Sequence, residues 1–73
     1  MQDTLAAVIT VNGGAQPLRA ETIAGLLAER EIDPSGRGLA IAVNGSVVPR
    51  AQWPQTRLTS GDSVEIVQAK QGG

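Results

Sequence analysis

The sequence contains no cysteine, no histidine, no tyrosine and no phenylalanine, and its single aromatic residue is Trp53. Structural metal sites in proteins are usually built from cysteine and histidine, so we expect no metal site. One tryptophan cannot provide the row of rings on which nucleic-acid bases would stack. Without cysteine, histidine or tyrosine no catalytic constellation can be assembled from the remaining residues, and we therefore expect a protein that is not an enzyme.

The sequence also lacks an excess of either positive or negative charge. The 73 residues have a net charge of −1, and the six lysines and arginines are spread between Arg19 and Lys70. Because no basic patch is available to neutralise phosphates, nucleic acid is not an expected partner. The lack of cysteine also fits a reducing compartment.

The sequence lacks a basic leader and long hydrophobic runs. Its first residues include Asp3 but no lysine or arginine, so the N-terminal segment does not resemble a signal peptide. No apolar run approaches the ~20 residues that a membrane-spanning helix needs. The expected location is therefore the cytoplasm, with no membrane partner.

The residues that are present predict one small globular domain. Hydrophobic residues make up 41% of the chain and charged residues 18%, a balance typical of a folded domain with an aliphatic core. The pairs Asn12-Gly13 and Asn44-Gly45 predict hairpin turns, and we expect no further role for them. Pro17 has no N–H for a ladder, which places its strand at a sheet edge. Strands are expected at residues 5–11, 16–19, 39–43, 47–48 and 63–68.

One segment has helical rather than strand periodicity, and it predicts a helix over residues 22–30. Gly25 weakens this helix by about 1 kcal/mol relative to alanine, and we interpret it as a point where a strand crosses closely. Residues 50–58 show no clear period and are expected to form a loop with one helical turn, in which Trp53 covers the end of the core. The apolar stripe of the helix consists of Ile23, Leu26, Leu27 and Ile32.

These elements fit one sheet with the helix on one face. The first and last strands are both apolar enough to need burial, so we expect them to lie side by side and parallel in the centre of the sheet. The expected fold class is α+β: a ubiquitin-like β-grasp with a mixed sheet of four to five strands, one helix packed across one face, and a flexible C-terminal tail. Residues 1–68 would form the domain and residues 69–73 the tail.

Five motifs follow one another in a specific order. They are VITVNG from Val8, IAGLLAER from Ile23, AVNGSVVPRAQW from Ala42, GDSVEIV from Gly61 and the terminal Gly72-Gly73. In this combination the chain resembles the ThiS family of thiamine-pathway sulfur carriers, and the resemblance covers essentially the whole chain from Val8.

The resemblance implies a cycle of reactions at the carboxylate of Gly73. An E1-like adenylating enzyme would use ATP and Mg²⁺ to form an acyl-adenylate there. Sulfur supplied by a cysteine desulfurase or another donor would then convert the adenylate to a thiocarboxylate, and thiazole synthase would take that sulfur for the thiazole ring of thiamine. The carrier itself would bind no cofactor.

The residues give physical reasons for this cycle. A carboxylate is a poor acyl donor, so Gly73 needs an activating partner, and the missing Cβ atoms of Gly72 and Gly73 would let the tail enter a narrow tunnel. Strand alternation places Val8, Ala42 and Val67 on the sheet face away from the helix. We expect these three side chains to contact the partner enzymes, with Arg50 as a candidate for an ion pair.

Other functions are compatible with the same pattern. The chain could carry sulfur for molybdopterin or sulfur-amino-acid synthesis, modify protein lysines as ubiquitin does, or serve as a β-grasp binding module with an inert tail. The molybdopterin relatives typically have an aromatic and proline-rich run before their glycines, whereas residues 66–69 here are Ile-Val-Gln-Ala. This difference and the VPRAQW block favour the thiamine pathway.

Overall fold

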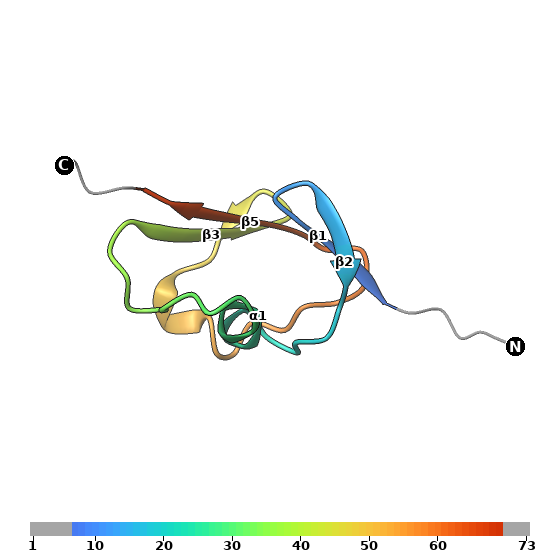
Figure 1. The fold of residues 1–73 in the computed structure, drawn as a ribbon, viewed down its shortest axis with the longest axis horizontal. Helices are drawn as coiled ribbons and strands as arrows, with labels where there is room; N and C mark the ends of the chain where they lie inside the picture. Colours follow the sequence, from blue (N-terminus) through green and yellow to red (C-terminus); the bar gives the residue numbers. More distant parts are fainter. Residues whose placement is uncertain (1–6, 70–73) are drawn as a thin grey trace, which may run out of the picture.

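We describe residues 7–69 from a computed structural model of the chain. They form a five-stranded sheet with one α-helix beneath it (Figure 1). The elements are β1 (Val8–Val11), β2 (Gly14–Pro17), α1 (Ile23–Glu29), β3 (Leu39–Val43), β4 (Ser46–Val47), the 3₁₀ turn η1 (Arg50–Gln52) and β5 (Ser63–Gln68). Among these elements no helix is long and apolar enough to cross a membrane.

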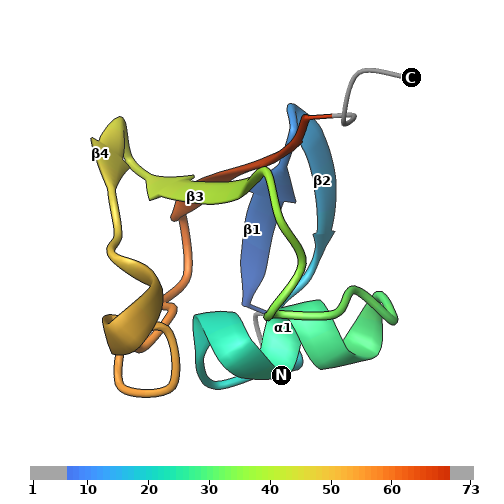
Figure 2. The same ribbon diagram turned by 90° about the vertical axis from the view of Figure 1, so that its left-hand side faces the viewer.

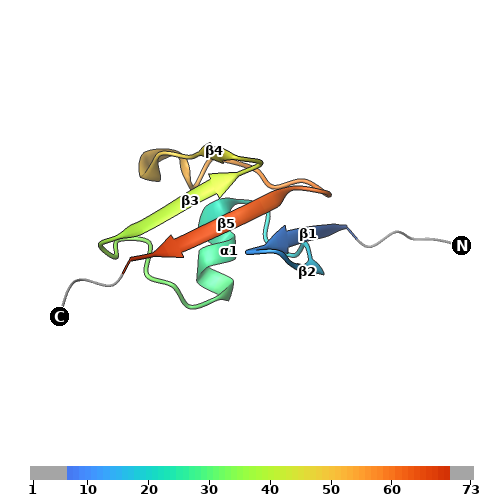
Figure 3. The same ribbon diagram turned by 90° about the horizontal axis from the view of Figure 1, so that it is seen from above.

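The last strand lies at the centre of the sheet. The strand order is β2-β1-β5-β3-β4, and Figure 3 shows β5 running between β1 and β3 with α1 behind them. β5 is parallel to β1, with Val11 opposite Val64, and antiparallel to β3, with Ile41 opposite Ile66. The predicted parallel pairing of the first and last strands is confirmed, as is the ubiquitin-like β-grasp arrangement.

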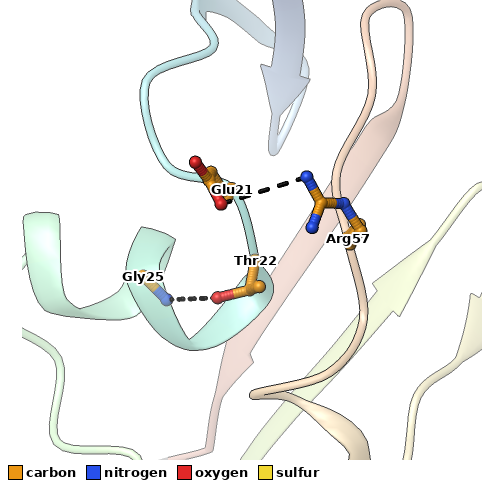
Figure 4. Close-up of polar contacts among 4 residues, drawn as sticks. All are labelled: Glu21, Thr22, Gly25 and Arg57. Atoms are coloured by element: carbon orange, nitrogen blue, oxygen red, sulfur yellow. Dashed lines mark hydrogen bonds and ion pairs between the residues drawn. The ribbon is translucent and has the colours of Figure 1, made fainter.

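The helix begins where the sequence predicts a change of period. Thr22 is its N-cap, and the Oγ1 atom accepts a hydrogen bond of 3.1 Å from the Gly25 N–H (Figure 4). Two further N–H groups at this end, of Ile23 and Ala24, donate to the carbonyl oxygens of Thr56 and Trp53 at 3.1 and 3.2 Å. The free donors of the first helical turn are thus satisfied by its own cap and by the 53–56 loop.

The structure explains the glycine at position 25 differently from the sequence analysis. A Cβ atom there would lie 3.2 Å from the Ala20 Cβ and 3.5 Å from the Thr22 Oγ1. The crowding therefore comes from the chain segment that leads into the helix, and the predicted close strand crossing is wrong.

The helix and the inner face of the sheet enclose an aliphatic core. Trp53 is 2% exposed, and its indole N–H donates to the Val48 carbonyl oxygen at 2.8 Å. The predicted structural role of this tryptophan is confirmed, since burial and a satisfied N–H are what a packed indole requires. The buried residues are Ile9, Val11, Ile23, Leu26, Leu27, Leu39, Ile41, Trp53, Leu58, Val64 and Ile66.

The first hairpin is tighter than the pattern predicts. β2 spans Gly14–Pro17 instead of residues 16–19, because pairing resumes directly after a two-residue turn, with Val11 opposite Gly14. Asn12 and Gly13 both have positive φ, 52° and 85°, as this turn requires. Pro17 lies at the outer edge strand, as expected.

The second hairpin repeats the same turn. Asn44 and Gly45 also have φ values of 52° and 85°. The return strand β4 is Ser46–Val47, and the N–H of Val48, which was expected to be part of it, donates to the Ile41 carbonyl oxygen at 2.9 Å.

The two turn asparagines do more than form turns. The Asn12 side chain is bonded to the backbone of Ile66, and the Asn44 side chain is bonded to the Ser63 N–H and the Asp62 carboxylate. The expectation that both Asn-Gly pairs have no further role is therefore wrong, because each amide reaches β5 across the sheet.

Candidate functional site

The sheet has one face that the helix leaves uncovered, as Figure 2 shows. The burial of β5 alternates along its length, with Val64 and Ile66 buried and Glu65 and Val67 exposed. Cross-strand partners share a face, so the uncovered side chains follow from the register. We call this surface the outer face, and it includes Val8, Thr10, Ala40, Ala42, Val47, Glu65 and Val67. The predicted alternation is confirmed.

The outer face is apolar with small side chains around one carboxylate. Val67 is 55% exposed and lies opposite Ala40, while Val47 is 75% exposed and lies opposite Ala42. Glu65 completes the row beyond Ala42. The small side chains of β3 therefore lie between the exposed valines of β4 and β5, and contiguous apolar surface of this kind is typical of sites where another protein docks.

Val8, Ala42 and Val67 all lie on the outer face, as predicted, but only Ala42 and Val67 lie close together. Ala42 and Val67 lie on the neighbouring strands β3 and β5, two register positions apart. Val8 lies at the other end, where its carbonyl oxygen accepts from the Gly61 N–H at 2.7 Å. Gly61 precedes Val67 by six residues, and six residues of extended chain span about 20 Å. One small contact could not cover all three.

Arg50 lies on the helix side of the sheet. One of its guanidinium N–H groups donates to the Gly36 carbonyl oxygen at 3.0 Å and approaches the Leu39 carbonyl oxygen at 3.4 Å. The guanidinium carbon is 4.8 Å from the centre of the Trp53 ring, within cation–π range. These internal contacts were not expected from the sequence. A contact between Arg50 and a partner stays a prediction.

Arg50 also lines a shallow depression of about 260 Å³. Apolar atoms of the helix and of two turns form most of it, and the lining residues are Ala24, Pro34, Ser35, Arg50, Trp53 and Pro54. The nearby carboxylate of Asp33 accepts from the backbone N–H and the hydroxyl of Ser35, which lower its pKa, and the charge of Arg50 acts in the same direction. This depression is separate from the outer face.

Asp62 was not singled out by the sequence, yet it joins two loops at the start of β5. Its carboxylate accepts from the Thr59 N–H at 2.9 Å and from the Asn44 amide at 3.0 Å. These two bonds hold the pKa of Asp62 below its usual value of 3.8. A Gly-Asp pair before a strand indicates only a turn, and the partner residue Asn44 is too far away in the sequence to be inferred.

The described chain ends beside β3. Gln68 is the last residue of β5 and lies opposite Leu39, and the Ala69 N–H donates to the Gly38 carbonyl oxygen at 2.9 Å. Gly73, the predicted site of covalent chemistry, and the tail residue Gly72 lie outside the described residues. In residues 7–69 no cluster of three or more aspartate or glutamate side chains could hold a metal ion.

One helix across a mixed five-stranded sheet, with parallel first and last strands at its centre, defines a ubiquitin-like protein of the β-grasp class. The ThiS family model matches residues 5–73, and the chain belongs to the ThiS family. The resemblance seen in the sequence motifs is thereby confirmed.

Two relatives support this membership. The sulfur carrier protein ThiS of Escherichia coli (strain K12) is 37% identical over 43 residues, which are 59% of this chain and 65% of that protein. The aligned segment thus spans slightly less than two thirds of the curated relative. A crystal structure of the thiamine biosynthesis protein (ThiS) from Geobacter metallireducens has a TM-score of 0.73 and 28% identity, and the match covers 90% of this chain and 99% of that one.

Proposed function

We propose that this protein is the sulfur carrier of thiazole formation in thiamine biosynthesis, acting through the carboxylate of Gly73. The observation that carries the proposal is the family match, which extends over residues 5–73 and so includes the terminal Gly72-Gly73. The names of both relatives, a sulfur carrier protein and a thiamine biosynthesis protein, support the same pathway.

The chain would be a substrate of other enzymes and not a catalyst. An E1-like partner would use ATP and Mg²⁺ to join the Gly73 carboxylate to AMP with release of pyrophosphate. The outer sulfur of a cysteine persulfide, supplied by a cysteine desulfurase or another donor, would displace AMP and form an acyl disulfide. Attack of a second thiol on the other sulfur of that bond would release the thiocarboxylate and leave a disulfide on the partner. Thiazole synthase would then accept the sulfur, all of this in the cytoplasm. The name of the Escherichia coli relative, a sulfur carrier protein, supports this assignment.

The outer face is the surface on which these partners would dock. Ala42 and Val67 lie on the half of the sheet from which β5 leads toward Gly73, so a partner that receives the Gly73 carboxylate would also cover them. Val8 would contact only a partner large enough to extend along β1. Contacts of this kind must be transient, because the carrier has to leave one enzyme for the next.

Intact-mass measurement tests the proposal directly. The protein would be purified from sulfur-replete cells that are starved of thiamine. We expect a fraction whose mass has increased by one oxygen-to-sulfur exchange, confined to the C-terminal peptide. Branched peptides that join Gly73 to lysines of other proteins, without any thiocarboxylate, would instead support a ubiquitin-like modifier.

Deletion of Gly73 provides the second test, with deletion of Gln2 as a matched loss of one residue at the other end. The first deletion should abolish thiazole formation with the melting temperature unchanged, and the second should leave both unchanged. Thiazole formation that persists without Gly73 would overturn the carrier mechanism. A chain that restores molybdopterin formation but not thiazole formation would assign the sulfur to the other pathway.

A further inference from the structure

The central strand β5 has unequal neighbours along its length. On one side β3 pairs with it from Val64 to Gln68. On the other side, within the described residues, the ladder of β1 covers only Ser63 and Val64. The chain of β1 then turns away into the hairpin at Asn12, so the half of β5 nearest to Gly73 has a neighbouring strand on one side only.

The side chain of Asn12 occupies the place of the missing strand residue. The Asn12 backbone N–H donates to the Val64 carbonyl oxygen at 2.9 Å. Its side-chain Oδ1 accepts from the Ile66 N–H at 2.8 Å, and its Nδ2 donates to the Ile66 carbonyl oxygen at 3.2 Å. Val64 and Ile66 are two residues apart, which is the spacing of successive bonds in a parallel ladder. The amide therefore continues the β1 ladder by one step.

On the opposite side, the end of β5 is bonded to the loop before β3, and Arg50 bonds to that loop in turn. The Ala69 N–H donates to the Gly38 carbonyl oxygen at 2.9 Å, and the Arg50 guanidinium donates to the carbonyl oxygen of Gly36 in that loop at 3.0 Å. The chain from Ile66 to Ala69 is thus bonded on both sides before the residues that lead to Gly73.

The turn itself does not require an asparagine. Glycine adopts the φ of 52° found at Asn12 without strain, so the turn geometry alone leaves the amide unexplained. Asn44 occupies the same position of an identical turn, but its amide bonds to Asp62 and Ser63 at the beginning of β5. The two asparagines therefore occupy equivalent turn positions but bond to different parts of β5, so a substitution at Asn44 is a matched control for the same substitution at Asn12.

We propose that Asn12 is a positioning residue for the C-terminal segment. Its side-chain amide fixes the course of β5 through Ile66 and so sets the direction in which the chain leaves the sheet toward Gly73. The part of this inference that concerns transfer rests on the proposed function. A segment that leaves the sheet in a fixed direction needs less ordering when it enters a partner's active site.

Hydrogen exchange on the isolated protein tests the structural part. Asn12→Gly should keep the turn and accelerate exchange of the Ile66 N–H about five- to thirtyfold, the factor expected for losing one to two hydrogen bonds. Asn44→Gly should accelerate exchange at Ser63 and leave Ile66 unchanged. Asn12→Asp keeps the acceptor for the Ile66 N–H and loses the donor, so it should fall between wild type and Asn12→Gly. Unchanged exchange at Ile66 in Asn12→Gly would overturn the proposal.

Adenylation kinetics with the E1-like enzyme test the positioning part. At a temperature well below the melting transition, Asn12→Gly should raise the KM for the carrier about three- to tenfold with kcat unchanged, and Asn44→Gly should change neither by more than about twofold. Equal KM values in wild type and Asn12→Gly, with exchange at Ile66 accelerated, would show that the amide is only structural and overturn the positioning role. If the wild-type chain is not adenylated at all, the proposed function fails, and the exchange experiment alone then decides whether Asn12 holds β5.

Discussion

The inner and outer faces of β5 differ although they alternate along one strand. Val64 and Ile66 point into the core between the sheet and the helix, whereas Glu65 and Val67 point to the uncovered side of the sheet. The inner residues join the aliphatic cluster that holds the fold together, and the outer residues have no partner within that cluster. Stability and partner binding are thus placed on adjacent residues, and substitutions at neighbouring positions can separate the two properties.

The largest effect is expected in the core, at Ile66 on the inner face of β5 and at Leu26 of α1 in the same buried cluster. Leu26→Ala and Ile66→Ala should each lower the free energy of unfolding by about 2–5 kcal/mol, because a buried aliphatic side chain is lost and a cavity remains. That is comparable with the whole stability of a domain of this size. Urea denaturation measures the loss, and Val67→Ala on the outer face is the control, with a change within about 0.5 kcal/mol. An unchanged midpoint in either core variant would show that the assigned core is wrong.

On the outer face, a charge should affect binding and not stability. Val67→Lys should weaken the interaction with the E1-like enzyme about tenfold, because an apolar contact is replaced by a charge that must lose water on docking. The melting temperature should stay near that of wild type, since the side chain is exposed. Val67→Thr keeps the branched shape and serves as the matched control. Adenylation unaffected by the lysine would remove Val67 from the docking surface.

Asp62 belongs to neither face and should have an intermediate effect that depends on pH. Its folded pKa is held below 3.8 by the Thr59 N–H and the Asn44 amide, so its contribution is present above pH 3.8 and is lost as the pH falls through the lower folded value. Asp62→Asn should reduce stability by about 1 kcal/mol at neutral pH. Below pH 3.8 the difference between variant and wild type should shrink, as measured by urea denaturation. A difference that stays constant with pH would contradict this assignment.

The smallest effect is expected at the start of the helix. Glu21 and Arg57 approach to 3.9 Å, with side chains 79% and 74% exposed (Figure 4). Such a pair contributes at most about 0.5 kcal/mol and is screened by salt. A double-mutant cycle with Glu21→Gln and Arg57→Gln measures the coupling. A value above about 1 kcal/mol would mean that exposed polar contacts matter more for this fold than the comparison of the two faces implies.

The strands at the centre of the sheet were predictable because their patterns are local. Residues 39–43 and 63–68 alternate between buried and exposed positions and end at clear turn signals, and the structure has both strands at these bounds. The second strand was misplaced by two residues. A two-residue turn allows pairing to resume at once, and neither Gly14 nor Ala15 has the strand propensity that would have indicated it.

The contacts of the two asparagines could not be predicted for a different reason. Asn12 and Ile66 are separated by 54 positions in the sequence, and the bond between them exists only once β1 and β5 lie side by side. An Asn-Gly pair predicts a turn whether or not its amide has a distant partner. For the same reason the sequence did not reveal that Arg50, the candidate for an ion pair, bonds to the Gly36 carbonyl oxygen and lies 4.8 Å from the centre of the Trp53 ring. The predicted site at Gly73 rests on the sequence motifs and the family match alone.

The central position of β5 also has a consequence for synthesis of the protein. Val64 and Ile66 are among the last core residues to leave the ribosome. The edge of β1 that pairs with β5 stays without a neighbouring strand until they emerge. Until then the apolar residues of β1, α1 and β3 have no closed core, so the nascent chain stays open to chaperones and proteases. Translation that stops before β5 leaves β1 and β3 without the strand that joins them in the sheet.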